Sequence, residues 1–135
     1  MIRSFRQFVR ERDGCRCEYC RLPDFAAPAS TFHLEHVVAK QHGGADNSGN
    51  RCWSCHRCNL HKGPNLSGRD PLTDNVVRLF DPRRQSWSRH FKWIGAVLIG
   101  RTQTGRATVA VLDINDPQRV ELRQALMDEG EWPDE

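Results

Sequence analysis

The amino-acid sequence predicts a small α+β fold, and three observations support this class. Apolar residues recur at helical spacing near the start of the chain, and an Asp-Pro pair gives a helix-start signal near its end. Between these segments, short β-rich runs alternate with loops that contain glycine or proline. Six cysteines, several of them in C-x-x-C pairs, indicate that metal ligation replaces part of a hydrophobic core. With 135 residues the chain has the length of one ordinary domain, and we predict a single domain over residues 1–135.

The first predicted element is a short amphipathic helix over residues 2–12. Ile2, Phe5, Phe8 and Val9 recur there at helical spacing, and the pattern stops at an Asp-Gly pair. A tight knuckle, CRCEYC, and a connector that contains proline and alanine follow this helix.

The middle of the chain predicts two strands and a helix. Residues 31–38, TFHLEHVV, are rich in β-branched and apolar side chains and predict a strand. A Gly-rich loop follows, strand character returns over residues 50–54, and residues 55–62 predict a short helix. Gly63 and the proline after it give this helix its stop signal.

The last third of the chain predicts a β-hairpin and a final helix. Residues 94–100 and 107–114 are apolar, β-rich runs joined by RTQTGR, which predicts a hairpin. Asp116 followed by Pro117 predicts the N-terminus of a helix that continues to about Asp128.

Charge and hydropathy limit the classes of partner. The formal net charge is only +3, but Asp81 is the one acidic residue between positions 75 and 112, a segment that carries seven Lys and Arg residues. Such a basic segment fits phosphate contacts or a solvated surface equally well. No apolar run approaches the length that crosses a bilayer and no signal sequence precedes the knuckle, so we expect a cytoplasmic protein with reduced cysteines.

The cysteine spacing predicts a tetrahedral structural zinc site. Such a site needs four thiolate or imidazole ligands, and two C-x-x-C knuckles supply four. In the first knuckle Cys17 and Cys20 have the usual spacing, whereas a pair with Cys15 would not. Free buried thiols are the alternative, but they are seldom spaced so regularly.

The second knuckle, RCWSCHRCN, is ambiguous because two overlapping C-x-x-C pairs can be drawn through it. Cys52 falls inside the predicted strand, whereas Cys55 and Cys58 lie at the turn into the helix, where free backbone amides can bind a thiolate. The position therefore favours Cys55 and Cys58 as the zinc ligands and leaves Cys52 outside the site.

The segment CEYC, followed by FHLEHVVAKQHGGADNSGNRCWSCHRCNLHKG, resembles the HNH endonuclease family, the zinc-knuckle branch of the ββα-metal nucleases. The resemblance covers about residues 12–63 and leaves residues 64–135 as an extension with the hairpin and the final helix. It implies that the strand, loop, strand and helix form a ββα-metal core that cleaves DNA.

The resemblance also implies roles for individual residues. His36 matches the general base, and Glu35 and Asn59 match the ligands of a catalytic divalent cation. A carboxylate and an amide oxygen suit Mg²⁺ or Mn²⁺. Asn50 matches the residue that fixes the loop and orients His36. Glu35 stands where aspartate is more frequent and Asn59 where histidine is commoner, and both substitutions keep an oxygen ligand.

DNA is the expected partner, and four basic residues are candidates for contacts with its phosphates: Lys40, Lys62, Arg83 and Arg84. For Lys62, a helix-end position that complements the helix dipole is an equal alternative. We expect the neighbouring aromatic side chains Trp87, Phe91 and Trp93 to be core residues.

Two other function classes fit parts of the sequence. A zinc-stabilised nucleic-acid-binding module without catalysis would need no histidine beside a carboxylate ligand, and a protein-interaction adaptor would need an exposed apolar face. The predicted function is therefore metal-dependent cleavage of DNA phosphodiester bonds. A homodimer, or sequential nicks, would let one site per chain cut both strands.

Overall fold

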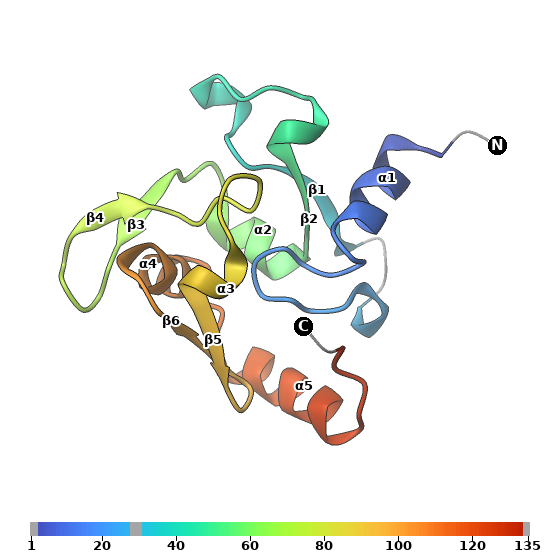
Figure 1. The fold of residues 1–135 in the computed structure, drawn as a ribbon, viewed down its shortest axis with the longest axis vertical. Helices are drawn as coiled ribbons and strands as arrows, with labels where there is room; N and C mark the ends of the chain where they lie inside the picture. The colour runs from blue at the N-terminus through green and yellow to red at the C-terminus, as the bar shows by residue number, and fades with distance from the viewer. Residues whose placement is uncertain (1–2, 28–30, 134–135) are drawn as a thin grey trace. The chain divides into compact units, whose positions relative to one another are not determined.

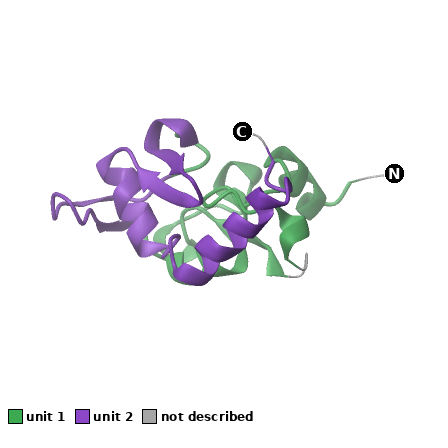
Figure 2. Cartoon of the chain, turned by 90° about the horizontal axis from the view of Figure 1, so that it is seen from below, with its two compact units in different colours: residues 1–65, 81–85 green, residues 66–80, 86–135 purple. Residues whose placement is uncertain are grey.

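The computed structural model describes residues 3–27 and 31–133, and these divide into two compact units. The first comprises residues 1–65 and 81–85, and the second comprises residues 66–80 and 86–135 (Figure 2). The single domain that the sequence predicts therefore stays a prediction. No helix in the described ranges is both long and apolar enough to cross a membrane.

In the first unit, two antiparallel strands precede a helix. The elements are α1 (Phe5–Arg12), β1 (His33–His36), β2 (Arg51–Ser54) and α2 (His56–Lys62), shown in Figure 1. The register pairs Glu35 with Cys52 and His36 with Arg51. These elements match the predicted ones closely, although the predicted helix start at Ile2 lies outside the described residues.

Trp53 on β2 is the centre of the core of the first unit. The indole is 1% exposed and stacks on Phe32 with ring centroids 5.5 Å apart. Asp13, which follows α1, accepts a hydrogen bond of 2.8 Å from the Trp53 backbone amide, and Asp24 accepts one of 3.2 Å from the indole Nε1. The end of the first helix and the segment after the knuckle are thereby fixed to β2.

The second unit is a mixed arrangement of two small hairpins and three helices among its described residues. Its elements are β3 (Ser67–Arg69), β4 (Val76–Arg78), α3 (Trp87–His90), β5 (Phe91–Ile94), β6 (Val97–Gly100), α4 (Gln103–Val111) and α5 (Pro117–Asp128). Trp87 and Phe91 are 8% and 1% exposed, so the prediction that they are core residues is confirmed, whereas Trp93 is only half-buried. The final helix also has its predicted bounds.

The predicted strand over residues 107–114 is wrong, because most of that segment belongs to α4. Thr102 caps this helix by accepting a hydrogen bond of 3.0 Å from Gly105 N through its side-chain oxygen. The hairpin instead pairs β5 with β6 and turns at Gly95, whose φ of +58° suits glycine. A short apolar run does not by itself distinguish a strand from a buried helix.

Asp70 fastens the β3–β4 hairpin to α4 in this unit. Its carboxylate accepts two hydrogen bonds of 2.9 Å from the Arg106 guanidinium and one of 2.7 Å from the Thr73 hydroxyl. The Arg106 contact holds the pKa of Asp70 well below its usual range.

Candidate metal and catalytic site

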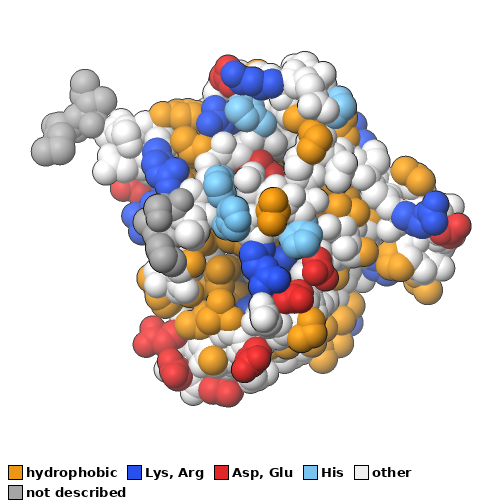
Figure 3. All heavy atoms as spheres, turned by 180° about the vertical axis from the view of Figure 1, so that it is seen from behind, with side chains coloured by type: hydrophobic (Ala, Val, Ile, Leu, Met, Phe, Trp, Pro, Cys, Tyr) orange, Lys and Arg blue, Asp and Glu red, His pale blue; other side chains and the backbone are white. Residues whose placement is uncertain are grey.

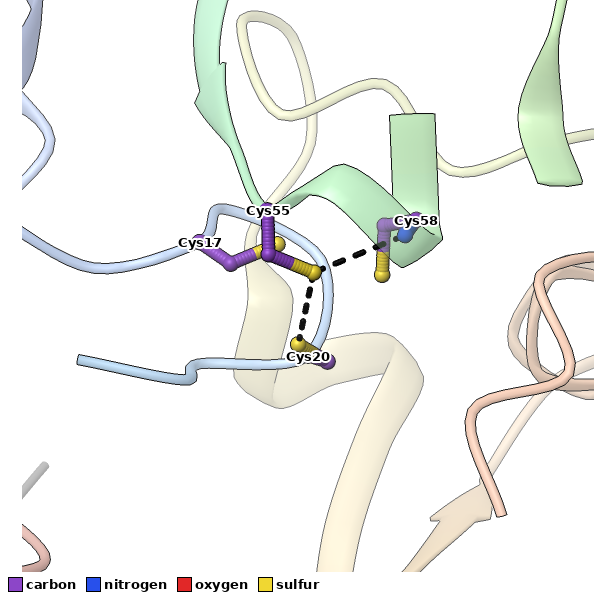
Figure 4. Close-up of side chains that lie close together, drawn as sticks. All are labelled: Cys17, Cys20, Cys55 and Cys58. Carbon is purple, nitrogen blue, oxygen red and sulfur yellow. Dashed lines mark hydrogen bonds between the residues drawn. The ribbon is translucent and has the colours of Figure 1, made fainter. Parts of the chain in front are cut away.

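Four cysteines form a compact cluster in the first unit. The Sγ atoms of Cys17, Cys20, Cys55 and Cys58 all lie within 4.8 Å of one another, and all four residues are buried (Figure 4). Zinc–sulfur bonds of about 2.3 Å in a tetrahedron place sulfurs roughly 3.8 Å apart, and Cys20 and Cys55 are separated by 3.7 Å. The cluster has the donor set and the spacing of a structural zinc site.

Local backbone geometry explains why these cysteines meet. Cys55 is the N-cap of α2, and its sulfur accepts a hydrogen bond of 3.5 Å from the Cys58 backbone amide. The Glu18 amide donates a hydrogen bond of 2.9 Å to Trp53 O, which holds the first knuckle beside β2. Burial raises the pKa of the Cys17 and Cys58 thiols, so a bound cation is needed to stabilise their thiolates.

The remaining two cysteines lie outside the cluster. Cys15 is half-buried and has a positive φ of 59°. Cys52 is fully buried on β2, where its sulfur lies 3.3 Å from Glu35 Oε2. The structure thus separates the overlapping C-x-x-C pairs as the sequence position favours, with Cys52 directed at a carboxylate.

Glu35 is a buried carboxylate with one oxygen left without a hydrogen bond. The residue is 6% exposed, and burial raises its pKa. Cys52 contacts Oε2, whereas Oε1 accepts no hydrogen bond from the described residues and lies 3.7 Å from the Lys62 ammonium. A buried, incompletely paired carboxylate oxygen needs an explanation, and coordination of a cation is one.

Lys62 lies inside the first unit rather than on its surface. It is 2% exposed, and its Nζ donates hydrogen bonds to Val37 O at 2.9 Å and to His36 O at 3.5 Å. Together with the Glu35 contact, these bonds tie the end of α2 to the end of β1. They favour a structural role for Lys62, and contact with DNA phosphate stays a prediction.

His36 follows Glu35 and has a carboxylate partner of its own. Its Nε2 lies 2.7 Å from Asp46 Oδ1. Because a carboxylate only accepts, this bond places a proton on Nε2 and leaves the lone pair of a neutral imidazole on Nδ1. The same contact is the main cause that lowers the pKa of Asp46. The His36 side chain is 24% exposed, so solvent reaches it.

Asn50 clamps the loop between the two strands. Its Oδ1 accepts a hydrogen bond of 2.8 Å from Val38 N, and its Nδ2 donates to Val38 O at 2.9 Å and to Ala45 O at 2.8 Å. A Cβ at Gly44 would lie 1.7 Å from Val38 O, which explains the second glycine of the loop. These contacts fit the loop-fixing part of the role that the resemblance implies for Asn50.

Asn59 is half-buried on α2 and precedes Lys62 by three residues. Residues at this spacing share one side of a helix. Asn59 therefore lies on the same side of α2 as Lys62, whose ammonium contacts Glu35. A role of its amide oxygen as a cation ligand stays a prediction.

The exposed basic residues are only part of the predicted set. Lys40 and Arg84 have side chains that are 65% and 86% exposed, whereas Arg83 is 16% exposed and forms ion pairs with Asp13 and Glu18. Burial and the nearby Asp13 carboxylate raise the pKa of Glu18 to about 8. Arg83 is thus held inside the unit, and its contact with DNA also stays a prediction.

Arg84 borders a polar hollow of about 280 Å³ that the Gly-rich loop and Asp81 also line. Figure 3 shows histidine side chains exposed near Lys and Arg side chains on one face of the molecule. In the first unit, His33 Nε2 and His56 Nδ1 lie 3.1 Å apart.

Sequence reasoning did not select Asp46 or Tyr19. Asp46 lies in the Gly-rich loop, where no periodicity indicates a neighbour, and its only signal is an acidic residue close after Gly43 and Gly44. Tyr19 lies between the two cysteines of the first knuckle, and its only signal is that it is the one tyrosine of the chain.

The two strands and the helix, with their cysteine cluster and adjacent carboxylate and imidazole, define a ββα-metal domain. Residues 17–65 match the family model described as HNH endonuclease, and the chain therefore carries an HNH endonuclease domain in this segment. The resemblance and the α+β class predicted from the sequence are confirmed. Members of this family are typically nucleases. No curated protein and no solved structure matches the chain.

Replacing Lys62 by methionine should destabilise the protein by about 3 kcal/mol, because removal of one partner leaves a buried charge uncompensated. Equilibrium urea unfolding of Lys62→Met measures this change. Adding Glu35→Gln to Lys62→Met should restore part of the loss, since the double variant buries no lone charge. A Lys62→Met protein as stable as the wild type would show that the buried pair does not form.

Proposed function

We propose that this protein cleaves DNA by hydrolysing phosphodiester bonds with the help of a divalent cation. The observation that carries the proposal is the adjacent pair at the end of β1: a buried carboxylate with an oxygen that lacks a hydrogen bond, followed by a solvent-accessible imidazole held by a second carboxylate. A module that only binds nucleic acid does not need this combination. The family match independently supports a nucleic-acid substrate.

The donor set fits a hard divalent cation. Glu35 offers its Oε1, and Asn59 offers an amide oxygen from the same side of α2 that reaches Glu35 through Lys62. Two protein oxygens would hold Mg²⁺ or Mn²⁺ and leave positions for water and phosphate oxygens. When bound, such a cation neutralises the negative charge that develops on the phosphate.

His36 supplies the base. With a proton on Nε2 and the lone pair on Nδ1, the neutral imidazole can accept a proton from water, and Asp46 then stabilises the imidazolium that results. Asn50 keeps the loop that carries Asp46 in place through its three hydrogen bonds. The products that the family implies are 5′-phosphate and 3′-hydroxyl ends.

The other groups hold the substrate and the scaffold. Lys40 and Arg84 are exposed enough to contact DNA phosphates. Zinc in the cysteine cluster would have no open position, because four protein ligands complete a tetrahedron, so it stabilises the fold without taking part in the reaction.

Incubation of supercoiled plasmid with the purified protein tests the proposal. We expect relaxed or linear plasmid when Mg²⁺ or Mn²⁺ is present, and intact plasmid when the catalytic cation is omitted while zinc is retained. A gel shift without strand breaks under every cation would reject cleavage and favour the non-catalytic binding module.

A further inference from the structure

A buried polar cluster connects the zinc knuckle to the candidate catalytic carboxylate. Tyr19 is 0% exposed, and burial together with the neighbouring Cys52 and Glu35 side chains raises the pKa of its hydroxyl. Cys52 completes the cluster, with its sulfur 3.3 Å from Glu35 Oε2 and 3.8 Å from the Tyr19 hydroxyl. Three polar side chains therefore meet beside the candidate site: one from the first knuckle, one from β1 and one from β2.

The position of Tyr19 in the chain gives this cluster its rigidity. Cys17 and Cys20 flank it, and both belong to the four-cysteine cluster. Glu18, the residue before it, donates its backbone amide to Trp53 O, and Arg21 donates its amide to Cys17 O. The backbone that carries the phenol is consequently fixed on both sides, so the hydroxyl has a defined place relative to β1.

We propose that Tyr19 is a positioning residue that directs the Glu35 carboxylate, so that the zinc knuckle sets the geometry of the catalytic cation site. This inference rests on the proposed function. Cys52 occupies Oε2, and the phenol restricts rotation of the carboxylate, which leaves Oε1 as the oxygen without a hydrogen bond. Groups that hold a metal ligand in this way typically affect metal affinity by ten- to a hundred-fold.

The test compares the wild type with Tyr19→Phe, which removes one oxygen atom and keeps the buried ring. We expect Mn²⁺ affinity, measured by titration calorimetry on zinc-loaded protein, to fall by roughly ten-fold or more. Zinc content should not change, and the variant should remain folded. An unchanged Mn²⁺ affinity in Tyr19→Phe, with wild type that binds Mn²⁺ and cleaves DNA, would overturn the inference and leave the proposed function intact.

Two further arms separate positioning from general packing. If Tyr19 and Cys52 act through the same carboxylate, the effect of Tyr19→Phe on Mn²⁺ affinity should be non-additive with that of Cys52→Ala.

Tyr19 is also the one tyrosine of the chain, so protein grown with fluorotyrosine has a single fluorine resonance. Mg²⁺ should shift this resonance in the wild type and leave it unchanged in Glu35→Gln. Equal shifts in both proteins would contradict the proposal that Tyr19 senses the cation through the Glu35 carboxylate. Wild type that neither binds Mn²⁺ nor cleaves DNA would instead reject the proposed function, and the inference with it.

Discussion

Replacing Cys58 by serine, or stripping zinc with a strong chelator, should unfold the first unit. The four clustered cysteines are buried, and burial raises the pKa of the Cys17 and Cys58 thiols. Structural zinc contributes an apparent free energy on the order of 10 kcal/mol in small domains, which is comparable to the whole stability of an ordinary domain. Loss of one ligand therefore removes more free energy than this unit can replace by packing.

Circular dichroism and zinc analysis measure this effect, and Cys15→Ser is the matched control. Cys15 is half-buried and lies outside the cluster, so its serine variant should retain zinc and the unfolding temperature of the wild type. Cys58→Ser should lose zinc and much of its ordered structure at room temperature. If Cys58→Ser kept one zinc per chain and the unfolding temperature of the wild type, Cys58 would not be a zinc ligand, and the four-cysteine zinc site would be rejected.

The features predicted well from the sequence are those with local signals. The C-x-x-C spacing, the β-rich stretch before the Gly-rich loop and the Gly-Pro stop after Lys62 each depend on residues close in the chain. They were sufficient to locate β1, β2 and α2, and to select Cys55 over Cys52. The order of these signals also carried the family resemblance that the match to residues 17–65 confirms.

The features that were missed depend on contacts between distant residues. The burial of Lys62 and Arg83 is one such feature, because it depends on ion pairs with carboxylates that are distant in the sequence, at Glu35 for Lys62 and at Asp13 and Glu18 for Arg83. A long basic side chain can point either way, and its sequence neighbours do not decide which. The pairing of Asp46 with His36 requires the conformation of the loop, which no periodic pattern specifies.

Replacing His36 by alanine should lower the rate of plasmid cleavage by about a hundred- to ten-thousand-fold, the usual contribution of a positioned base. The imidazole is accessible to solvent, and Asp46 fixes its tautomer through a contact of 2.7 Å. Alanine removes the proton acceptor while it leaves Glu35 and Asn59, the proposed cation ligands, in place. Initial rates on supercoiled plasmid with Mg²⁺ measure the loss.

His42→Ala is the matched control, because His42 is an exposed histidine of the loop that follows β1 and carries Asp46. It should retain the wild-type rate within a few-fold. Because a base acts in the chemical step, His36→Ala should keep the Mn²⁺ affinity and DNA affinity of the wild type while kcat falls. Equal cleavage by His36→Ala and wild type would assign the base to another group, whereas equal losses in both histidine variants would indicate that the loop, rather than the His36 imidazole, is what cleavage requires.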